Sequence, residues 1–382
     1  MARPTVIYLD YAAATPLDTS VFAAMKPYLT DEYFNPSAQY DSARAVKKGL
    51  EAARAQVAHW FGARPSEVVF TAGGTEANNL VIHGVMGQYP DSNIVVSSVE
   101  HDSVLLPAQR YACKQALVSM DGTIDISNLK TLIDDQTVLV SVQYANNEVG
   151  TIQPIRQITQ MVSEISKTRK KQGNDLPLYV HTDACQAPAY LDVHTSQLGV
   201  DFMTINASKI YGPKQTGTLF IKAGTILTAQ ILGGGQERGL RSGTENVANA
   251  VGLAAALDLV QSRRHEEIAR IQQLQTVFFD QLATRLPDVQ VNGTRKHRLP
   301  NNVHITIPGI DNERLMMELD ERGILCAVGS ACSASNEEPS HVLTAMGLPD
   351  SAAQSSLRFT LGHQTTEDNV RQVVDTLHDL VS

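Results

Sequence analysis

The sequence predicts an α/β protein with a mainly parallel central sheet and a second, smaller α+β domain. Between Glu67 and Lys222, short runs rich in β-branched residues alternate with helical stretches; the runs are EVVF, NIVVSSV, TVLVSVQYA, LYVHTDA, DFMTINA and TGTLFIK. Such alternation is typical of a parallel sheet with helices on its faces. Because ligands of these sheets bind at the carboxyl ends of the strands, the polar residues found there are the candidate site.

The second domain is predicted from a change of pattern after the parallel region. A long helical stretch runs from Glu245 to about Leu286, and beyond it VQVNG, NNVHITI, ILCAV and LRFTL predict strands that are separated by helices. This mixture predicts a smaller α+β domain. We assign residues 15–258 to the large domain, and residues 1–14 with 259–382 to the small domain.

The composition is that of a folded protein without a strong charge bias. The chain has 382 residues, 43% of them apolar and 19% charged, which is enough for a sizeable core. Its 31 basic and 40 acidic side chains give a net charge of −9, so binding to nucleic acids or anionic membranes through bulk charge is disfavoured. The apolar segments are too short for a signal-peptide core or for the ~20 residues that cross a bilayer, and we expect a cytoplasmic protein.

The cysteines predict neither a disulfide framework nor a metal site, because no two of them form a C-x-x-C pair. Any special cysteine must therefore act alone. Cysteines are more often buried apolar filler, and we expect this of Cys326. Cys332 lies among small and polar residues in GSACSASNEEP, which are poor core material, so we expect exposure and reactivity there.

The segment TAGGTEANN, residues 71–79, follows one predicted strand and opens a helix. Its two glycines allow the backbone to close on a ligand, and the free N–H groups of a helix start attract phosphate. The alternative is a threonine-capped helix after a tight turn. From this segment alone the two interpretations are equally supported.

A carboxylate and an amine lie at the ends of neighbouring predicted strands, where Asp183 closes LYVHTD and Lys209 follows MTINAS. Taken singly, an aspartate and a lysine most often form an ion pair. The more specific interpretation is that the lysine forms an imine with an aldehyde cofactor, while the aspartate keeps the ring nitrogen of that cofactor protonated. His101, after the second strand, is either a satisfied polar residue or one that stacks on a flat ring and passes protons.

Arg358 interrupts the otherwise apolar strand in SSLRFTLG. A planar guanidinium fixed there suits a substrate carboxylate that is held by two parallel hydrogen bonds. A structural ion pair with one of the many acidic residues is the competing interpretation, and both stay open at this point.

Taken together, segments along the chain resemble one known family. In order they are YLDYAAATP, TAGGTEANN, EHDSV, NNEVG, DACQA, NASKIYGPK, RSGTEN, GSACSAS with the downstream EEPSHVL, and SLRFTLG. This set, from about residue 7 to 362, resembles the NifS/IscS-type cysteine desulfurases, pyridoxal-phosphate enzymes of the class V aminotransferase group. The resemblance implies fold type I, with a large domain that binds pyridoxal 5'-phosphate and a small domain that carries the loop with Cys332.

The resemblance also implies which residues surround the cofactor ring. Lys209 would hold the cofactor through a covalent imine, and Asp183 would pair with the pyridinium nitrogen. Gln186 would hydrogen-bond the ring hydroxyl, and His101 would stack on the ring. Lys209 and His101, together with Cys332, are then the implied catalytic residues.

For the phosphate, the resemblance implies the Gly74 backbone and Thr75. Thr244 of RSGT would reach the phosphate of the neighbouring subunit, so a homodimer is implied. The family usually has serine and histidine at two further phosphate-holding positions, where this chain has Asn206 and Ser208. Because a hydrogen bond to a charged group contributes about 1.5–3 kcal/mol, this exchange can lower cofactor affinity without abolishing the site.

For the substrate, the resemblance implies that Asn147 and Arg358 bind the carboxylate of L-cysteine and that Cys332 takes its sulfur as a persulfide. L-Alanine is the other product. The sulfur would pass to an acceptor protein for iron–sulfur cluster assembly or tRNA thiolation. The family pattern N-P-S-S-x-H ends in Tyr40 here, a change that leaves the chemistry in place and puts only local contacts in question.

Two alternatives share many of these residues. A selenocysteine lyase or another class V transferase would keep Lys209, Asp183 and His101 but would not need Cys332 in a segment of small polar residues. A non-catalytic scaffold, with cofactor binding weakened by Asn206 and Ser208, is the alternative from a different class. Colour separates the scaffold from the enzymes, because protein that holds the cofactor as an imine is yellow and bleaches with borohydride.

Overall fold

The computed structural model describes residues 6–329 and 339–382, so the predicted sulfur acceptor Cys332 lies outside the described residues. The strands, in chain order, are β1 (Ile7–Tyr8), β2 (Val68–Thr71), β3 (Asn93–Ser97), β4 (Ala112–Ala116), β5 (Thr137–Ser141), β6 (Tyr179–Asp183), β7 (Phe202–Asn206), β8 (Gly217–Ile221), β9 (Gln290–Val291), β10 (Asn302–Thr306), β11 (Ile324–Leu325) and β12 (Ser356–Thr360).

The helices are α1 (Thr19–Met25), α2 (Pro27–Thr30), α3 (Asp41–Phe61), α4 (Gly74–Gln88), α5 (Asp102–Ala108), α6 (Ile126–Leu132), α7 (Ile155–Lys171), α8 (Thr195–Leu198), α9 (Val247–Ser262), α10 (Arg264–Arg285), α11 (Asn312–Glu321), α12 (His341–Ala345), α13 (Asp350–Ala353) and α14 (Glu367–Val381). Short 3₁₀ turns are η1 (Pro65–Glu67), η2 (Ala207–Lys209) and η3 (Glu237–Gly239).

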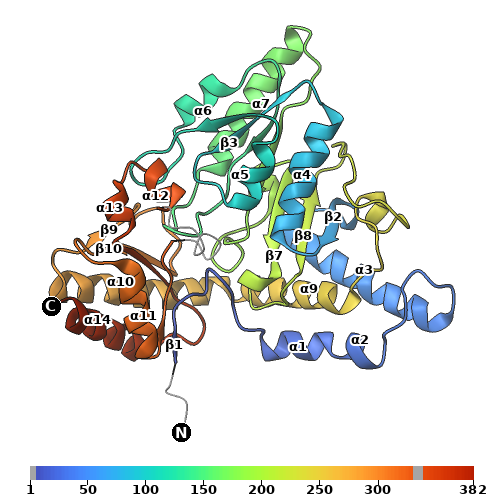
Figure 1. Ribbon diagram of the computed structural model, residues 1–382. Coiled ribbons are helices and arrows are strands. Elements are labelled where there is room, and N and C mark those ends of the chain that lie inside the picture. The colour runs from blue at the N-terminus through green and yellow to red at the C-terminus, as the bar shows by residue number, and fades with distance from the viewer. Residues whose placement is uncertain (1–5, 330–338) are drawn as a thin grey trace.

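A seven-stranded sheet forms the centre of the molecule, in the order β2-β8-β7-β6-β5-β3-β4 (Figure 1). The pairs from β4 across to β7 are parallel, while β8 runs antiparallel to both β7 and β2. The prediction of a mainly parallel sheet is confirmed. The edge strand β4 is missing from the predicted runs, because its sequence ACKQA lacks the β-branched and aromatic residues that mark a strand.

Helices cover both faces of this sheet. Alternate residues of a strand point to opposite faces, so Ile94 and Val96 of β3 join one apolar cluster and Val95 joins another. The first cluster includes side chains of α4 and α5, and the second includes side chains of α3, α7 and α9. With both faces apolar, polar side chains are concentrated at the strand ends.

Two smaller sheets contain the remaining strands. β12, β10 and β9 form an antiparallel sheet in that order, with α10 packed against β10 and α14 packed against α10. β1 pairs in parallel with β11, so the N-terminal segment lies among C-terminal elements (Figure 1). This mixture confirms the predicted α+β character of the second part of the fold, while the domain boundaries stay a prediction.

The predicted helical stretch from Glu245 to Leu286 is two helices. α9 ends at Ser262 and α10 begins at Arg264, and Arg263 between them has φ −100° and ψ 3°, away from helical values. α9 packs against α1 and α3, whereas α10 packs against α14. Among the residues that the structure describes, no helix combines the length and the apolar character that crossing a membrane requires.

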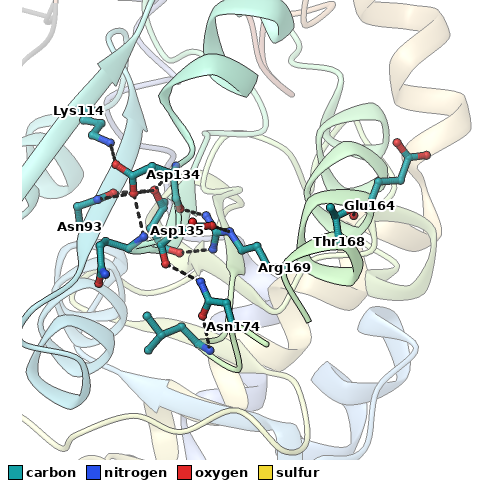
Figure 2. A network of polar contacts seen from close by, with 11 residues as sticks. Asn93, Lys114, Asp134, Asp135, Glu164, Thr168, Arg169 and Asn174 are labelled. Atoms are coloured by element: carbon teal, nitrogen blue, oxygen red, sulfur yellow. Dashed lines mark hydrogen bonds and ion pairs between the residues drawn. The ribbon is translucent and has the colours of Figure 1, made fainter. Parts of the chain in front are cut away.

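A polar network closes the amino ends of β3 and β5, opposite the strand ends that carry the candidate site (Figure 2). The Asp134 carboxylate accepts hydrogen bonds from the Lys114 ammonium and from Asn93 Nδ2 (2.9 Å). Burial acts to raise the pKa of Asp134, but these donors hold it well below its ordinary value. From α7, Arg169 donates to the main-chain carbonyls of Thr137 (2.8 Å) and Asp134. The network therefore ties α7 to the sheet.

We expect the Arg169→Ala variant to lower the free energy of unfolding by about 3 kcal/mol, because two carbonyl acceptors lose their donor and buried unsatisfied acceptors cost about 1–3 kcal/mol each. The Arg169 side chain is only 4% exposed, so water cannot replace it freely. Urea unfolding of the wild type and the variant measures the change. Arg156→Ala, on the exposed side of the same helix, is the control and should have an effect below about 0.5 kcal/mol. Equal urea midpoints for Arg169→Ala and Arg156→Ala would contradict the role of Arg169 in fixing α7 to the sheet.

Candidate active site

The candidate site residues lie at one edge of the large sheet. Lys209 follows β7, Asp183 ends β6, and His101 follows β3, and these strands are parallel. β2 runs in the same direction as β7, since each is antiparallel to β8. The helix start at Gly74 therefore lies at the same edge as the other groups.

The turn before α4 is a cradle for an anion. Gly73 has φ +143°, a conformation that side chains rarely adopt, and a Cβ atom at Gly217 would lie 2.6 Å from the Gly73 carbonyl carbon. A Cβ atom at Gly74 would lie 2.7 Å from Cys185 Sγ and 3.6 Å from Asn206 Nδ2. No side chain caps the first N–H groups of α4, so they are available to a phosphate. Of the two sequence interpretations, the threonine cap is wrong, since Gly73 is the N-cap.

Asp183 is held by a chain of buried polar groups that reaches His101. Asp183 is 8% exposed; its Oδ1 accepts from the Cys185 N–H (2.9 Å) and its Oδ2 accepts from Asn78 Nδ2 (2.7 Å). Asn78 Nδ2 also donates to Ser103 Oγ (2.9 Å), which lies 2.9 Å from His101 Nδ1. The Ser103 N–H donates to that same Nδ1 (3.0 Å), so in the neutral ring the proton is on Nε2.

Asn78 and Ser103 are site residues that the sequence analysis missed. Asn78 is fully buried and lies four residues after Gly74, which is one turn along the face of α4 that covers the sheet. Helical spacing from the glycines is the signal that points to it. Ser103, two residues after His101, carries no such signal, because serine at the start of a helix is usually a surface cap.

Lys209 lies at the same edge of the sheet as Asp183, in η2 directly after β7. Its Nζ donates to the Ala13 carbonyl (2.5 Å), and Gln186 Nε2 donates to the Ala12 carbonyl (3.0 Å). Burial raises the pKa of the Cys185 thiol well above its ordinary value; the Asp183 charge adds to this rise and the Lys209 charge opposes it. One thiol therefore senses both groups, which places Asp183 and Lys209 within electrostatic reach of a common point.

The residues next to Lys209 and on the opposing loops have distinct surroundings. Asn206 Oδ1 accepts from both the N–H (3.1 Å) and the Oγ (3.0 Å) of Ser208, which leaves the Asn206 amide nitrogen on the side of Gly74. Thr75 is exposed in the first turn of α4. Thr244 is exposed on the loop after Arg241. Arg241 pairs with Glu76 (2.9 Å), so this loop is fixed to the start of α4.

Arg358, in β12, faces the same region with its guanidinium buried. Its Nη1 donates to the main-chain carbonyl of Asn147 (3.0 Å), and its Nη2 pairs with Asp10 Oδ1 (2.7 Å). The ion pair that the sequence analysis left open is thus present, with Asp10 as the partner. Among the described contacts of the guanidinium, Nε has no acceptor.

The cysteines that the structure describes are all poor nucleophiles. Burial raises the pKa of Cys113 to about 11 and that of Cys326 to about 12, and it raises the pKa of Cys185 well above its ordinary value. Only a thiolate is nucleophilic, so these side chains are inert at neutral pH. Cys332, the predicted acceptor, is outside the described residues, and its role stays a prediction.

The described residues on either side of positions 330–338 contact the site. Before them, Ala327 pairs with Arg358 through two main-chain hydrogen bonds (2.8 and 3.1 Å). After them, Ser340 Oγ donates to the Glu148 carboxylate (2.5 Å), and His341 Nε2 donates to the Glu100 carbonyl (2.9 Å), one residue before His101. Both flanks of the segment that contains Cys332 therefore lie beside candidate site residues.

Comparison with known proteins identifies the family. The model of the class V aminotransferases matches residues 7–373. The chain belongs to this family. A cysteine desulfurase IscS of Dictyoglomus turgidum is 38% identical, over 98% of this chain and 94% of that relative. A solved NifS-like protein is 30% identical with a TM-score of 0.90, covering 99% of each chain, and a solved structure titled "SspA in complex with cysteine" is 30% identical with a TM-score of 0.80, covering 94% of this chain and 99% of that one.

The comparisons confirm the resemblance to NifS/IscS-type cysteine desulfurases and the fold type I architecture. Pyridoxal phosphate, the cofactor of this family, needs an anion cradle, an amine and a carboxylate in one place. The open α4 amides, Lys209 and the buried Asp183 provide these three, so the residues present fit the cofactor. No group of three or more His, Cys, Asp or Glu side chains in the described ranges could hold a metal ion.

Proposed function

We propose that this chain is a pyridoxal-phosphate-dependent cysteine desulfurase, which converts L-cysteine to L-alanine and transfers the sulfur to Cys332. The proposal depends above all on one observation, the placement of Asp183, Lys209 and the start of α4 at the same edge of the large sheet, at or after the ends of β6, β7 and β2. The printed names of the relatives support the substrate, since one is a cysteine desulfurase and another was solved with cysteine.

The cofactor ring would be held by four side chains. Lys209 would bond to the aldehyde carbon, and Asp183 would keep the ring nitrogen protonated, because its carboxylate is buried and fixed by two donors. Gln186 would hydrogen-bond the ring hydroxyl. His101 would stack on the ring, with its Nδ1 held by Ser103.

The phosphate would lie against the first amides of α4. Gly74 allows the approach because it has no Cβ, and Thr75 would add its hydroxyl. Asn206 Nδ2 faces the same cradle, and Ser208 fixes that amide by donating to its oxygen. Ser208 stands where the family usually has histidine and Asn206 where it usually has serine, so we expect weaker phosphate binding than a histidine would give.

L-Cysteine would bind between Arg358 and Lys209. Arg358 would take the substrate carboxylate through its remaining N–H groups, with Asn147 beside it. The cofactor, when bound, would withdraw electrons from the substrate Cα and so make the Cα proton acidic. The Lys209 amine would accept that proton as a general base.

The sulfur would then move to Cys332. The Cys332 thiolate attacks the substrate sulfur, a sulfur–sulfur bond forms, the substrate Cβ–S bond breaks, and Cβ keeps the electron pair and is protonated to the methyl group of L-alanine. His101 would be the proton partner of the thiol. The contacts of Ala327 and His341 with the site support this assignment, since they hold both flanks of the segment beside it.

A homodimer is part of the proposal, because Thr244 would complete the phosphate site of the partner subunit. Thr244 is exposed, and so are nearby apolar side chains of the same loop region; Leu232 is 82% exposed. Exposed apolar side chains of this kind are typical of a contact surface. The proposed domain division, residues 15–258 against 1–14 and 259–382, is supported by the confinement of the large sheet to β2–β8.

The experiment is a product assay on purified protein supplied with pyridoxal phosphate, L-cysteine and a thiol reductant. We expect L-alanine and sulfide in equal amounts and a yellow protein that borohydride bleaches. Faster turnover of selenocysteine than of cysteine would favour a selenocysteine lyase, and colourless protein in excess cofactor would favour a scaffold. An iron–sulfur scaffold or a tRNA-thiolation protein would be the final acceptor, and capture with the Cys332 persulfide would identify it.

A further inference from the structure

The N-terminal turn of residues 10–15 lies inside the candidate site and contacts both ends of the proposed substrate region. The turn is closed by a hydrogen bond from the Ala13 N–H to the Asp10 carbonyl (3.0 Å). It is fixed to β12, where the Thr360 N–H donates to the Leu9 carbonyl (2.7 Å). At one end Asp10 pairs with Arg358, and at the other the Ala13 carbonyl accepts from Lys209 Nζ.

The Asp10 carboxylate balances the positive charge of the buried Arg358 guanidinium. The Arg358 side chain is 1% exposed, and among the described residues Asp10 is its ion-pair partner. A buried guanidinium without a counter-charge is unfavourable, so the Asp10 carboxylate stabilises Arg358 there. His304, opposite Arg358 on β10, does not supply charge, because burial, with help from Arg298 and Arg358, lowers its pKa to about 3.

The Arg358 guanidinium has more N–H donors than its described acceptors use. Arginine has five N–H groups, and its described acceptors are Asp10 Oδ1 on Nη2 and the Asn147 carbonyl on Nη1. These two contacts fix the plane of the guanidinium, and a fixed plane is what two parallel hydrogen bonds to a substrate carboxylate need. Asp10 is 19% exposed, more than Arg358, so it lies on the open side of the pair.

We propose that Asp10 is a positioning residue for substrate recognition: it orients Arg358 for the substrate carboxylate, and its turn sets the spacing between that carboxylate and the Lys209 amine. Ala13 of the turn contacts Lys209 and Asp10 of the same turn contacts Arg358, so the conformation of one turn determines both contacts. The spacing then selects α-amino acids, which carry the two groups on one carbon. This inference rests on the proposed role of Arg358.

The test compares Asp10→Ala and Asp10→Asn in steady-state turnover of L-cysteine. We expect Asp10→Ala to raise KM at least about tenfold while kcat changes less than about threefold, because ground-state and transition-state binding of the carboxylate are lost alike. Asp10→Asn keeps an acceptor oxygen and should restore KM to within about threefold of the wild type. Asp31→Asn, an exposed aspartate near the same terminus, should match the wild type.

Binding of 2-aminoethanethiol, which lacks a carboxylate, separates positioning from general damage. Its effect on the absorbance of the bound cofactor should be the same in Asp10→Ala and in the wild type. An unchanged KM in Asp10→Ala, an equal loss for both ligands, or failure of Asp10→Asn to restore KM would each overturn the proposal. Arg358→Ala tests the proposed function apart from Asp10, because an unchanged KM there would refute the carboxylate site itself.

Discussion

Replacing Lys209 with alanine should remove the covalent attachment of the cofactor and lower the rate of L-alanine formation by at least about 10³-fold, since the variant loses both the imine and the general base. In the wild type, borohydride should fix the cofactor to the protein so that it survives denaturation. In Lys209→Ala the cofactor should be released on denaturation. Absorbance after gel filtration in denaturant measures the difference.

Lys214→Ala is the matched control for this prediction. Lys214 lies five positions further along the same loop, is exposed, and donates to the Thr15 carbonyl (3.2 Å). Its variant should keep the cofactor and most of the activity. A Lys209→Ala enzyme that forms L-alanine at the wild-type rate would refute the assignment of this lysine.

The Cys332→Ala variant should bind the cofactor and respond to L-cysteine in absorbance, yet release sulfide at least about 10²-fold more slowly with a reductant present. The expectation follows from the sulfur balance, because without a second thiol the substrate sulfur has no protein acceptor. Sulfide and L-alanine are measured over the same interval as for the wild type.

Two other cysteines provide controls of the same chemistry. Cys113→Ala and Cys326→Ala remove thiols that burial keeps protonated, with pKa values of about 11 and 12 in the wild type. Both variants should turn over L-cysteine at close to the wild-type rate. Wild-type turnover by Cys332→Ala, or loss of turnover only in one of the controls, would mean that the acceptor has been misassigned.

The sheet was largely predictable because its central strands are buried on both faces and therefore read as continuous β-branched runs. β4 was not predicted, because it is an edge strand and four of its five residues are exposed or half-buried. The break between α9 and α10 was not predicted either. No proline or glycine marks Arg263, and the two helices pack against different elements, which a local sequence pattern does not reveal.

The site residues were predictable where an ionisable side chain lies at or just after the end of a predicted strand, as for Asp183 and Lys209. Asn78 was not predicted: it lies one helical turn after Gly74, but a single sequence does not show that its partner is Asp183. The segment YLDYAAATP was recognised as a motif but had no role. Asp10 and Arg358 are 348 positions apart, and a single sequence contains no signal for a pair at that separation.

The pairing of β1 with β11, Ile7 against Ile324, has a consequence for biosynthesis. The residues of β1 are translated more than 300 positions before their partners in β11, so they find their neighbours later than the strands of the large sheet do. A nascent chain can build the central sheet from β2 to β8 while its leading segment is still unplaced. The N-terminal turn can therefore take its place in the candidate site only after β11 and β12 have been translated.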